Sequence, residues 1–278
     1  MRRKKRIAVH SVTVLLLYGT LFACTVKESR QECPCWAIFN LENFLELKDY
    51  EDVMTGILTA NRLMDKETVA LTDYAVRPYE KKLSSRITTT FTGAVGFDGM
   101  VCRSDSLVCD RGAECSSLWT ANTTLPCDDD YVWVDLHPHK DYSKITFVVL
   151  GIASTDEFEY DLRVRANYNG IRLRDRKPVE GSYLAYARPL EAGAMYEVRV
   201  PRQMDEEMVL DILIPRSDRD YTVDDRVDLM ALGKRLSSQG FSWDKEDLDD
   251  VLVTIDYSRV IVSVEIGDWT EHGLDVEI

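Results

Sequence analysis

The chain has 278 residues, with 34 Lys and Arg against 48 Asp and Glu, which gives a formal net charge of −14. Hydrophobic residues make up 45% and aromatic residues 9%, as in folded globular proteins, so a disordered chain is excluded. The acidic excess argues against nucleic acid as a partner, because phosphates require a Lys/Arg surface. No apolar run approaches the ~18 residues of a membrane-spanning helix. Composition therefore leaves one or two acidic domains.

The first 23 residues predict a secretory signal. Residues 2–6 are all Arg or Lys, and an apolar stretch from Val12 to Phe22 follows, too short to be a stable spanning helix. Leu21-Phe22-Ala23-Cys24 resembles a bacterial lipobox, in which the cysteine is acylated and becomes the first mature residue. We therefore predict lipidation of Cys24, against the alternative of an ordinary cleaved signal with an incidental cysteine.

Cleavage before Cys24 leaves a mature chain of 255 residues with 29 basic and 48 acidic residues, a net charge of −19. This charge disfavours binding along an anionic leaflet, so membrane attachment is expected to come from the lipid. Residues 24–32 predict a hydrophilic tether. Within it, Lys27–Glu32 resembles the charged signal that sends Bacteroidia lipoproteins to the outer face of the outer membrane.

Six further cysteines predict disulfides, because an even number in an exported chain is typical of a disulfide framework. Six thiols allow about 15 pairings, which the sequence does not sort. A single residue separates Cys33 from Cys35, so each is expected to pair elsewhere, and no C-x-x-C motif supports a zinc ribbon. The six candidates are Cys33, Cys35, Cys102, Cys109, Cys115 and Cys127.

Strand signals dominate from Cys33 onward, because Val, Ile, Thr and aromatic residues cluster in short or alternating runs. The last two runs flank Tyr257–Arg259 and predict a β-hairpin. The expected strands lie at 36–41, 68–76, 86–95, 131–136, 144–151, 159–165, 183–187, 195–200, 208–214, 251–256 and 260–266.

Two segments predict helices. Residues 223–239 carry apolar side chains at three- and four-residue spacings, with Thr222 as N-cap and Gly240 to end the helix. Residues 49–64 show a weaker pattern that Gly56 interrupts.

These elements predict an all-β fold with one crossover helix, because a lone helix among strands lacks the rhythm of an α/β protein. About a dozen strands suit two tandem β-sandwiches rather than one. We place the N-terminal sandwich, with the cysteines, at 33–139 and the C-terminal sandwich at 140–278.

Several short motifs are distributed along the chain: the lipobox, Glu32–Cys35, Gly112–Leu118, Arg165–Ile171, Pro178–Gly181, and the strand 260–266 followed by Gly267-Asp268-Trp269. Together they resemble the FimB/Mfa-type fimbrial anchor (minor fimbrial subunit) family of Bacteroidia. The resemblance implies two transthyretin-like β-sandwiches, lipid-anchored at the outer membrane. It also implies a non-catalytic subunit that holds type V fimbriae to the cell, ends polymerisation and has pilin subunits as partners.

The C-terminal segment carries Leu274, Val276 and Ile278 in alternation, a pattern typical of a short strand. In strand-exchange polymers such a segment adds to the open sheet of a neighbouring subunit. The alternative is an edge strand of its own sandwich, because terminal segments commonly dock locally.

A weak metal candidate lies at the expected domain break, where Asp135, His137, His139 and Asp141 alternate and would share one face of an extended chain. The simpler interpretation is a polar linker, and we predict no metal and no cofactor. Catalytic motifs such as G-x-S-x-G and the Walker loop are missing from the sequence, so we predict no enzyme activity. The acidic runs at 128–130 and 244–250 lack EF-hand spacing and predict solvated loops.

The alternative to the anchor is a surface glycan-binding lipoprotein, which would need exposed aromatic side chains on one face. Trp119 and Trp243 lie near loops and are the candidates for stacking on a sugar. Trp36, Trp133 and Trp269 lie in or beside strands and are predicted to belong to the core.

Overall fold

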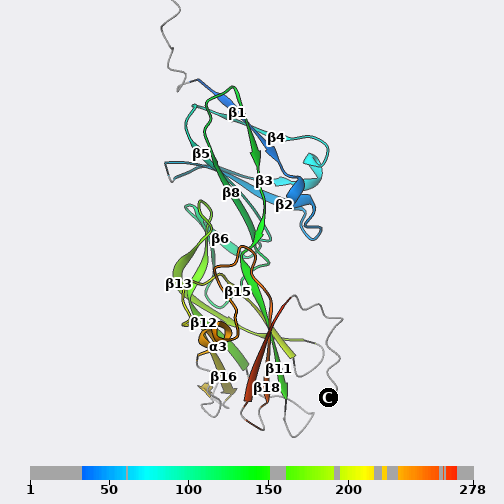
Figure 1. The fold of residues 1–278 in the computed structure, drawn as a ribbon, viewed down its shortest axis with the longest axis vertical. Coiled ribbons are helices and arrows are strands. Elements are labelled where there is room, and N and C mark those ends of the chain that lie inside the picture. The colour runs from blue at the N-terminus through cyan, green and yellow to red at the C-terminus, as the bar shows by residue number, and fades with distance from the viewer. Residues whose placement is uncertain are drawn as a thin grey trace, which may run out of the picture.

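Nearly all regular structure in the computed structural model is β-strand, arranged as two lobes that follow one another along the long axis (Figure 1). The structure describes residues 33–60, 62–150, 161–190, 195–215, 221–223, 231–256, 259 and 261–267. The expectations for the signal at 1–23, for Cys24 and the tether at 24–32, for Trp269, and for Leu274, Val276 and Ile278 fall outside these residues.

The strands of the first lobe are β1 (Cys35–Asn40), β2 (Asp52–Thr59), β3 (Arg62–Ala70), β4 (Tyr79–Leu83), β5 (Thr89–Val95), β8 (Trp119–Leu125), β9 (Tyr131–Asp135) and β10 (His139–Lys140). They form a three-stranded sheet in the order β4-β1-β9 and a five-stranded sheet in the order β10-β8-β5-β2-β3. A short helix α2 (Glu42–Leu45) and a 3-10 turn η1 (Leu71–Tyr74) lie among them. The core includes Phe39, Phe44 and Phe91, all fully buried.

The strands of the second lobe are β11 (Tyr142–Leu150), β12 (Asp161–Arg172), β13 (Lys177–Tyr186), β14 (Arg188–Pro189), β15 (Met195–Pro201), β16 (Val209–Pro215), β17 (Tyr221–Val223), β18 (Val251–Asp256) and β19 (Ile261–Ile266). One sheet has the order β14-β15-β11-β18-β19. The other contains β17, β16 and β12, with β13 also paired to β12. The core between them includes Phe147 and Tyr183, whose hydroxyl donates a 2.6 Å hydrogen bond to the Arg199 carbonyl oxygen. The all-β sandwich fold predicted from the sequence is confirmed.

A hairpin from the first half of the chain joins the sheet of the second lobe. Its strands are β6 (Met100–Arg103) and β7 (Ser106–Cys109), and β7 pairs with β12 to extend that sheet to the order β17-β16-β12-β7-β6. Beneath the hairpin, a small apolar cluster combines Met54 and Leu118 from the first lobe with Leu107, Ile171 and Leu173. The hairpin therefore connects the predicted range 33–139 to the predicted range 140–278.

One described helix of the second lobe, α3 (Leu232–Ser238), corresponds to the end of the helix expected at 223–239. Leu232 and Leu236 are fully buried in the second core. The predicted N-cap was wrong, because Thr222 lies in β17 and the cap position is Ala231. Within the described residues, no helix is long and apolar enough to cross a membrane.

The helix expected at 49–64 was wrong, because this segment forms β2 and the start of β3. Strand β2 is central in its sheet and its residues are buried on both faces: Val53 and Ile57 point into the first core, while Met54 joins the cluster under the hairpin. A strand covered on both faces loses its period-two alternation, so its apolar spacing can imitate a helix.

The strand expected at 68–76 ends earlier, at Ala70, and continues as the 3-10 turn η1. The C-terminal hairpin is confirmed, with β18 and β19 paired antiparallel from Val251↔Ile266 to Asp256↔Ile261. Alternation between more and less exposed residues is seen in the edge strand β19, whereas β18 is buried along most of its length.

Glycine at position 170 should be required for docking of the β6–β7 hairpin. A Cβ there would lie 2.1 Å from the Leu107 carbonyl oxygen and 2.8 Å from the Val108 Cα, both backbone atoms. We expect Gly170→Ala to lower the free energy of unfolding by about 1–3 kcal/mol, the usual cost of forced overpacking. Hydrogen exchange should rise in β6 and β7.

Gly181→Ala is the matched control, because a Cβ there meets only the side chain of Asn169, which can move. Unchanged exchange in β7 of Gly170→Ala would contradict the proposed role of this close backbone approach.

Candidate functional site

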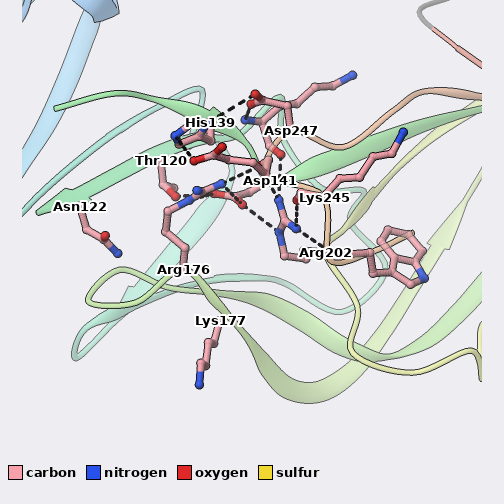
Figure 2. A network of polar contacts seen from close by, with 12 residues as sticks. Thr120, Asn122, His139, Asp141, Arg176, Lys177, Arg202, Lys245 and Asp247 are labelled. Carbon is pink, nitrogen blue, oxygen red and sulfur yellow. Dashed lines mark hydrogen bonds and ion pairs between the residues drawn. The ribbon is translucent and has the colours of Figure 1, made fainter. Parts of the chain in front are cut away.

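A buried carboxylate, Asp141, lies between β10 and β11, where the chain passes from one lobe to the other (Figure 2). Its exposed fraction is 0%, and both oxygens accept hydrogen bonds. Arg202 Nε donates to Oδ1 at 3.0 Å and Arg176 Nη2 to the same oxygen at 2.9 Å. Arg176 Nε donates to Oδ2 at 3.3 Å, and the Thr120 hydroxyl donates to Oδ2 as well. One carboxylate thus holds two guanidinium groups and a hydroxyl.

Arg202 is itself buried, with 7% exposed, and connects Asp141 to the loop before β18. Its Nη1 donates to the carbonyl oxygens of Trp243 and Lys245 at 2.5 Å each, and its Nη2 to that of Glu246 at 2.9 Å. Burial, which the nearby Asp141 opposes, leaves the pKa of Arg202 below its ordinary value. This guanidinium is therefore fixed by its partners on every side.

Arg176 reaches Asp141 from the tight turn between β12 and β13. Its φ is 54°, in the left-handed region that side chains rarely adopt, and its backbone N–H donates to the Arg172 carbonyl oxygen at 2.8 Å. Such a conformation costs energy and persists where surrounding contacts hold it. Here the guanidinium forms an ion pair with Asp141 and donates to the Glu246 carbonyl oxygen at 3.0 Å.

A second buried ion pair stands beside the first. Lys140 Nζ lies 2.6 Å from Asp250 Oδ1, and the exposed fractions of the two residues are 8% and 9%. The same carboxylate oxygen accepts the Lys144 backbone N–H at 2.9 Å. The Lys140 backbone N–H donates to Asp247 Oδ1 at 2.8 Å. We call the set Thr120, Lys140, Asp141, Arg176, Arg202 and Asp250 the polar junction.

The polar junction joins elements of both lobes. Thr120 lies in β8 of the first lobe, and the Asp141 backbone N–H donates to the Leu118 carbonyl oxygen at 3.0 Å. Close by, Asn122 Nδ2 donates to the Leu173 carbonyl oxygen at 3.2 Å. Because ion pairs with both partners buried are costly to break, these contacts resist separation of the lobes.

The polar junction is built for structure rather than chemistry. Both oxygens of Asp141 are occupied by donors, and the group has no solvent access, so it cannot take a proton from a substrate. Across the part of the chain that the structure describes, no three His, Cys, Asp or Glu side chains gather as a metal would require.

The four residues of the weak metal candidate do not converge. Asp135 and His137 are exposed, with 3.4 Å between Asp135 Oδ2 and His137 Nε2. His139 contacts Glu246 and Asp247 instead. Asp141 is turned inward to its arginines. Their alternation does not put them on one face, because β9 ends at Asp135 in one sheet and β10 begins at His139 in the other.

The two acidic runs, 128–130 and 244–250, form ion pairs with basic side chains. Arg86, 8% exposed, forms an ion pair with Asp130, and its Nη1 donates to the Asp128 carbonyl oxygen at 3.1 Å. In the second run, Asp250 holds Lys140 as described above. These carboxylates thus have partners that the expectation of plain solvated loops omitted.

The six cysteines are free thiols in the structure, and four of them form two contacting pairs. Cys35 and Cys127 are fully buried in the first core, where each thiol lies close enough to influence the other. Burial, reinforced by the Cys127 thiol, raises the pKa of Cys35 to about 11. The other pair is Cys109 and Cys115, where the mutual hydrogen bond, with burial, raises the pKa of Cys115 well above its ordinary value.

The tryptophans depart from expectation. Trp119 and Trp243 are half-buried and pack against the first and second cores, which does not fit a stacking platform. Trp36 and Trp133, predicted as core, are 39% and 69% exposed. They stand with Tyr131, 61% exposed, on the outer face of the β4-β1-β9 sheet. We call Trp36, Tyr131 and Trp133 the aromatic face.

The sequence contained a signal for this face. Residues 131, 133 and 135 alternate with Val132 and Val134, and only one of these two sets can point to the core. The valines do so, and the aromatic side chains consequently point outward. The prediction was wrong because it assigned a tryptophan to the core for lying in a strand, without asking which face of the strand it occupies.

The fold is similar to those of several solved proteins from Bacteroides and Porphyromonas. The fimbrial anchor protein Mfa2 from Porphyromonas gingivalis is similar over 85% of this chain and 98% of its own, with 10% identity and a TM-score of 0.55. Two proteins from Bacteroides thetaiotaomicron have TM-scores of 0.54. One, a candidate adhesin, has 14% identity over 88% of this chain and 98% of its own; the other, a candidate polysaccharide-binding protein, has 12% over 87% and 100%.

No family model and no curated protein matches the sequence. The expected likeness to Mfa-type fimbrial proteins is thus confirmed for the fold, at identities that carry no information about the activity.

Replacing Asp141 tests the polar junction. Asp141→Asn leaves the buried Arg202 without its counter-charge, so we expect the free energy of unfolding to fall by about 3–5 kcal/mol. Urea titration measures this loss. Hydrogen exchange should rise at the backbone of β8, whose Thr120 binds the carboxylate, and of β11, which begins at the residue after Asp141.

Asp211→Asn is the matched control. Asp211 is also fully buried and holds two arginines, Arg163 and Arg165, but all three lie in the second lobe. Burial would raise its pKa, yet the hydrogen bonds from both arginines outweigh it and leave the pKa below its ordinary value. Faster exchange in β8 of this control, or none in Asp141→Asn, would remove the special role of Asp141.

Proposed function

We propose that this protein is a non-catalytic, lipid-anchored subunit that holds fimbriae at the outer membrane and ends their polymerisation. The observation that carries the proposal is a fold shared with the fimbrial anchor Mfa2 along nearly the whole of both chains. The lipobox at Cys24 supports a cell-surface location, because an acylated N-terminus ties an otherwise hydrophilic chain to a membrane. The candidate adhesin with the same fold supports a surface role as well.

The polar junction suits a subunit under tension. The described chain begins beside β1 in the first lobe, and near its other end the Gly267 backbone N–H donates to the Asp250 carbonyl oxygen at 3.0 Å. A force applied between the two ends of the described chain therefore reaches the ion pair of Asp250 with Lys140. Resistance at that point keeps the two lobes together while the fibre pulls.

The partner is a pilin subunit, joined by strand addition. We propose that Leu274, Val276 and Ile278 supply the donated strand. The described chain leaves the edge strand β19 at Gly267. A segment that follows an edge strand can reach a neighbouring subunit without opening either core.

Two variants separate attachment to the membrane from attachment to the fibre. Cys24→Ser removes the acylated thiol, so the protein should move to the soluble fraction and assembled fibres should appear in the medium. Deletion of residues 270–278 should leave the protein folded and membrane-bound, but cells should lack attached fibres. Membrane fractionation, circular dichroism and electron microscopy of the cell surface measure these outcomes.

If cells from which the gene for this protein has been deleted keep their fibres attached, the proposed anchor function is contradicted. Unfolding of the 270–278 deletion variant would instead assign these residues to an edge strand of their own sandwich. Membrane retention of Cys24→Ser would contradict lipidation while leaving strand donation to be judged by the deletion.

We also propose that the contacting thiols become disulfides in the exported protein, pairing Cys35 with Cys127 and Cys109 with Cys115. Each pair would lose two electrons and two protons to the disulfide of an exported thiol oxidoreductase, which is reduced to its dithiol. The two members of each pair belong to the same hydrophobic core. Cys35 and Cys127 lie in the core of the first lobe, and Cys109 and Cys115 lie in the core of the second lobe. A disulfide in each would add about 2–4 kcal/mol of stability.

Alkylation under denaturing, non-reducing conditions tests this pairing in protein purified from the cell envelope. Cys33 and Cys102 should be modified, while the four paired residues should be modified only after reduction. Peptide mass spectrometry should find the two expected cross-links. Complete modification of all six thiols without reductant would overturn the proposal.

A further inference from the structure

The outer face of the β4-β1-β9 sheet displays aromatic rings in neighbouring rows. In the register of β1 with β9, Trp36 lies opposite Tyr131, and Ile38 lies opposite Trp133. Their inward neighbours Ala37 and Val134 belong to the first core. Trp133 is therefore held by a strand fixed from beneath, although its own ring is 69% exposed.

Charged and amide side chains border the rings on both sides. In β4, Lys82 lies opposite Trp36 and Glu80 opposite Ile38, and both are exposed. Beyond Trp133, Asn40 Nδ2 donates to Asp135 Oδ1 at 3.3 Å. Flat apolar rings and hydrogen-bonding groups thus occur side by side on one face.

The size of the face limits its occupant. Three strands spaced ~4.8 Å apart and five residues of ~3.3 Å each give about 10 by 15 Å. A stable protein–protein interface buries about 800 Å² on each partner, several times this area, and its core is depleted of charge. The face is thus too small and too polar at its border for a second protein subunit. A short oligosaccharide, whose sugar rings have apolar faces and hydroxyl groups at their edges, matches the aromatic face in size and chemistry.

Charge further restricts the ligand. The acidic run 128–130 immediately precedes Tyr131, and the mature chain has a net charge of −19. Anionic polymers and anionic lipid surfaces are repelled by such a field. A neutral ligand is not.

We propose that the aromatic face binds a neutral oligosaccharide, with sugar rings stacked on Trp133 and on the Trp36–Tyr131 pair. Glu80, Lys82 and the Asn40–Asp135 pair accept and donate hydrogen bonds at the hydroxyl edges. This site differs from the one expected at Trp119 and Trp243, which are packed into the cores. It does not depend on the anchor function, because the fibre attachment proposed above uses residues 270–278 and none of these side chains.

Isothermal titration of the mature protein with short neutral gluco-, manno- and galacto-oligosaccharides tests the proposal. We expect at least one series to bind and the tryptophan fluorescence to change on binding. Trp133→Ala and Trp36→Ala should each weaken that binding by about tenfold or more, as for central aromatic contacts in other interfaces. Because Trp133 is exposed, its variant should keep the thermal midpoint of the parent.

Tyr186→Ala is the matched control, because Tyr186 is an aromatic residue 44% exposed in the second lobe. Its binding should be unchanged. No binding across the three series, or equal binding by Trp133→Ala, would overturn the proposal. The proposal would also be overturned if Trp133→Ala kept carbohydrate binding but lost self-association, vesicle binding or pilin binding. That result would assign the aromatic face to the partner whose binding was lost.

Discussion

A single buried carboxylate organises the junction between the two lobes. Asp141 has no exposed surface, so its charge is tolerable only because Arg176 and Arg202 stand within hydrogen-bond distance. These arginines come from a β-turn and from the end of β15, and the carboxylate is held in turn by Thr120 of β8. Loss of Asp141 would leave the buried Arg202 without a counter-charge, so this carboxylate keeps the four elements together. The positions of β10, β11 and the loop before β18 follow from this constraint.

The constraint gives the fold its mechanical character. The β6–β7 hairpin crosses from the first lobe into the sheet of the second, and the Asp250–Lys140 ion pair holds the loop next to Gly267. A lipid at one end and a fibre at the other would therefore pull on a body cross-connected at its middle. The aromatic face lies on β1 and β9, away from the polar junction. Ligand binding at the aromatic face therefore need not disturb the ion pairs of the junction.

Sequence reasoning succeeded where runs of strand-forming residues flank a short connecting segment. The 251–266 hairpin and the all-β class follow from such runs, which depend only on neighbouring residues. It failed in β2, buried on both faces, where apolar spacing imitated a helix. It failed again for Trp133, which was assigned to the core although Val132 and Val134 occupy the inward face of the same strand.

The polar junction was beyond the sequence for a different reason. Asp141 meets Arg176 and Arg202 across 35 and 61 positions, and no local pattern identifies partners so far apart. The alternation that grouped Asp135 and His137 with His139 and Asp141 assumed one continuous strand, whereas β9 and β10 belong to different sheets. Thiol pairing had the same limit, since 15 arrangements of six cysteines are equivalent until the fold brings Cys35 to Cys127.

The polar junction makes the two sandwiches one cooperative body, and differential scanning calorimetry of the mature protein measures that cooperativity. We expect one transition whose calorimetric enthalpy equals its van't Hoff enthalpy, because both lobes unfold together. Two separate transitions, or a calorimetric enthalpy about twice the van't Hoff value, would show that the lobes unfold independently and would contradict it.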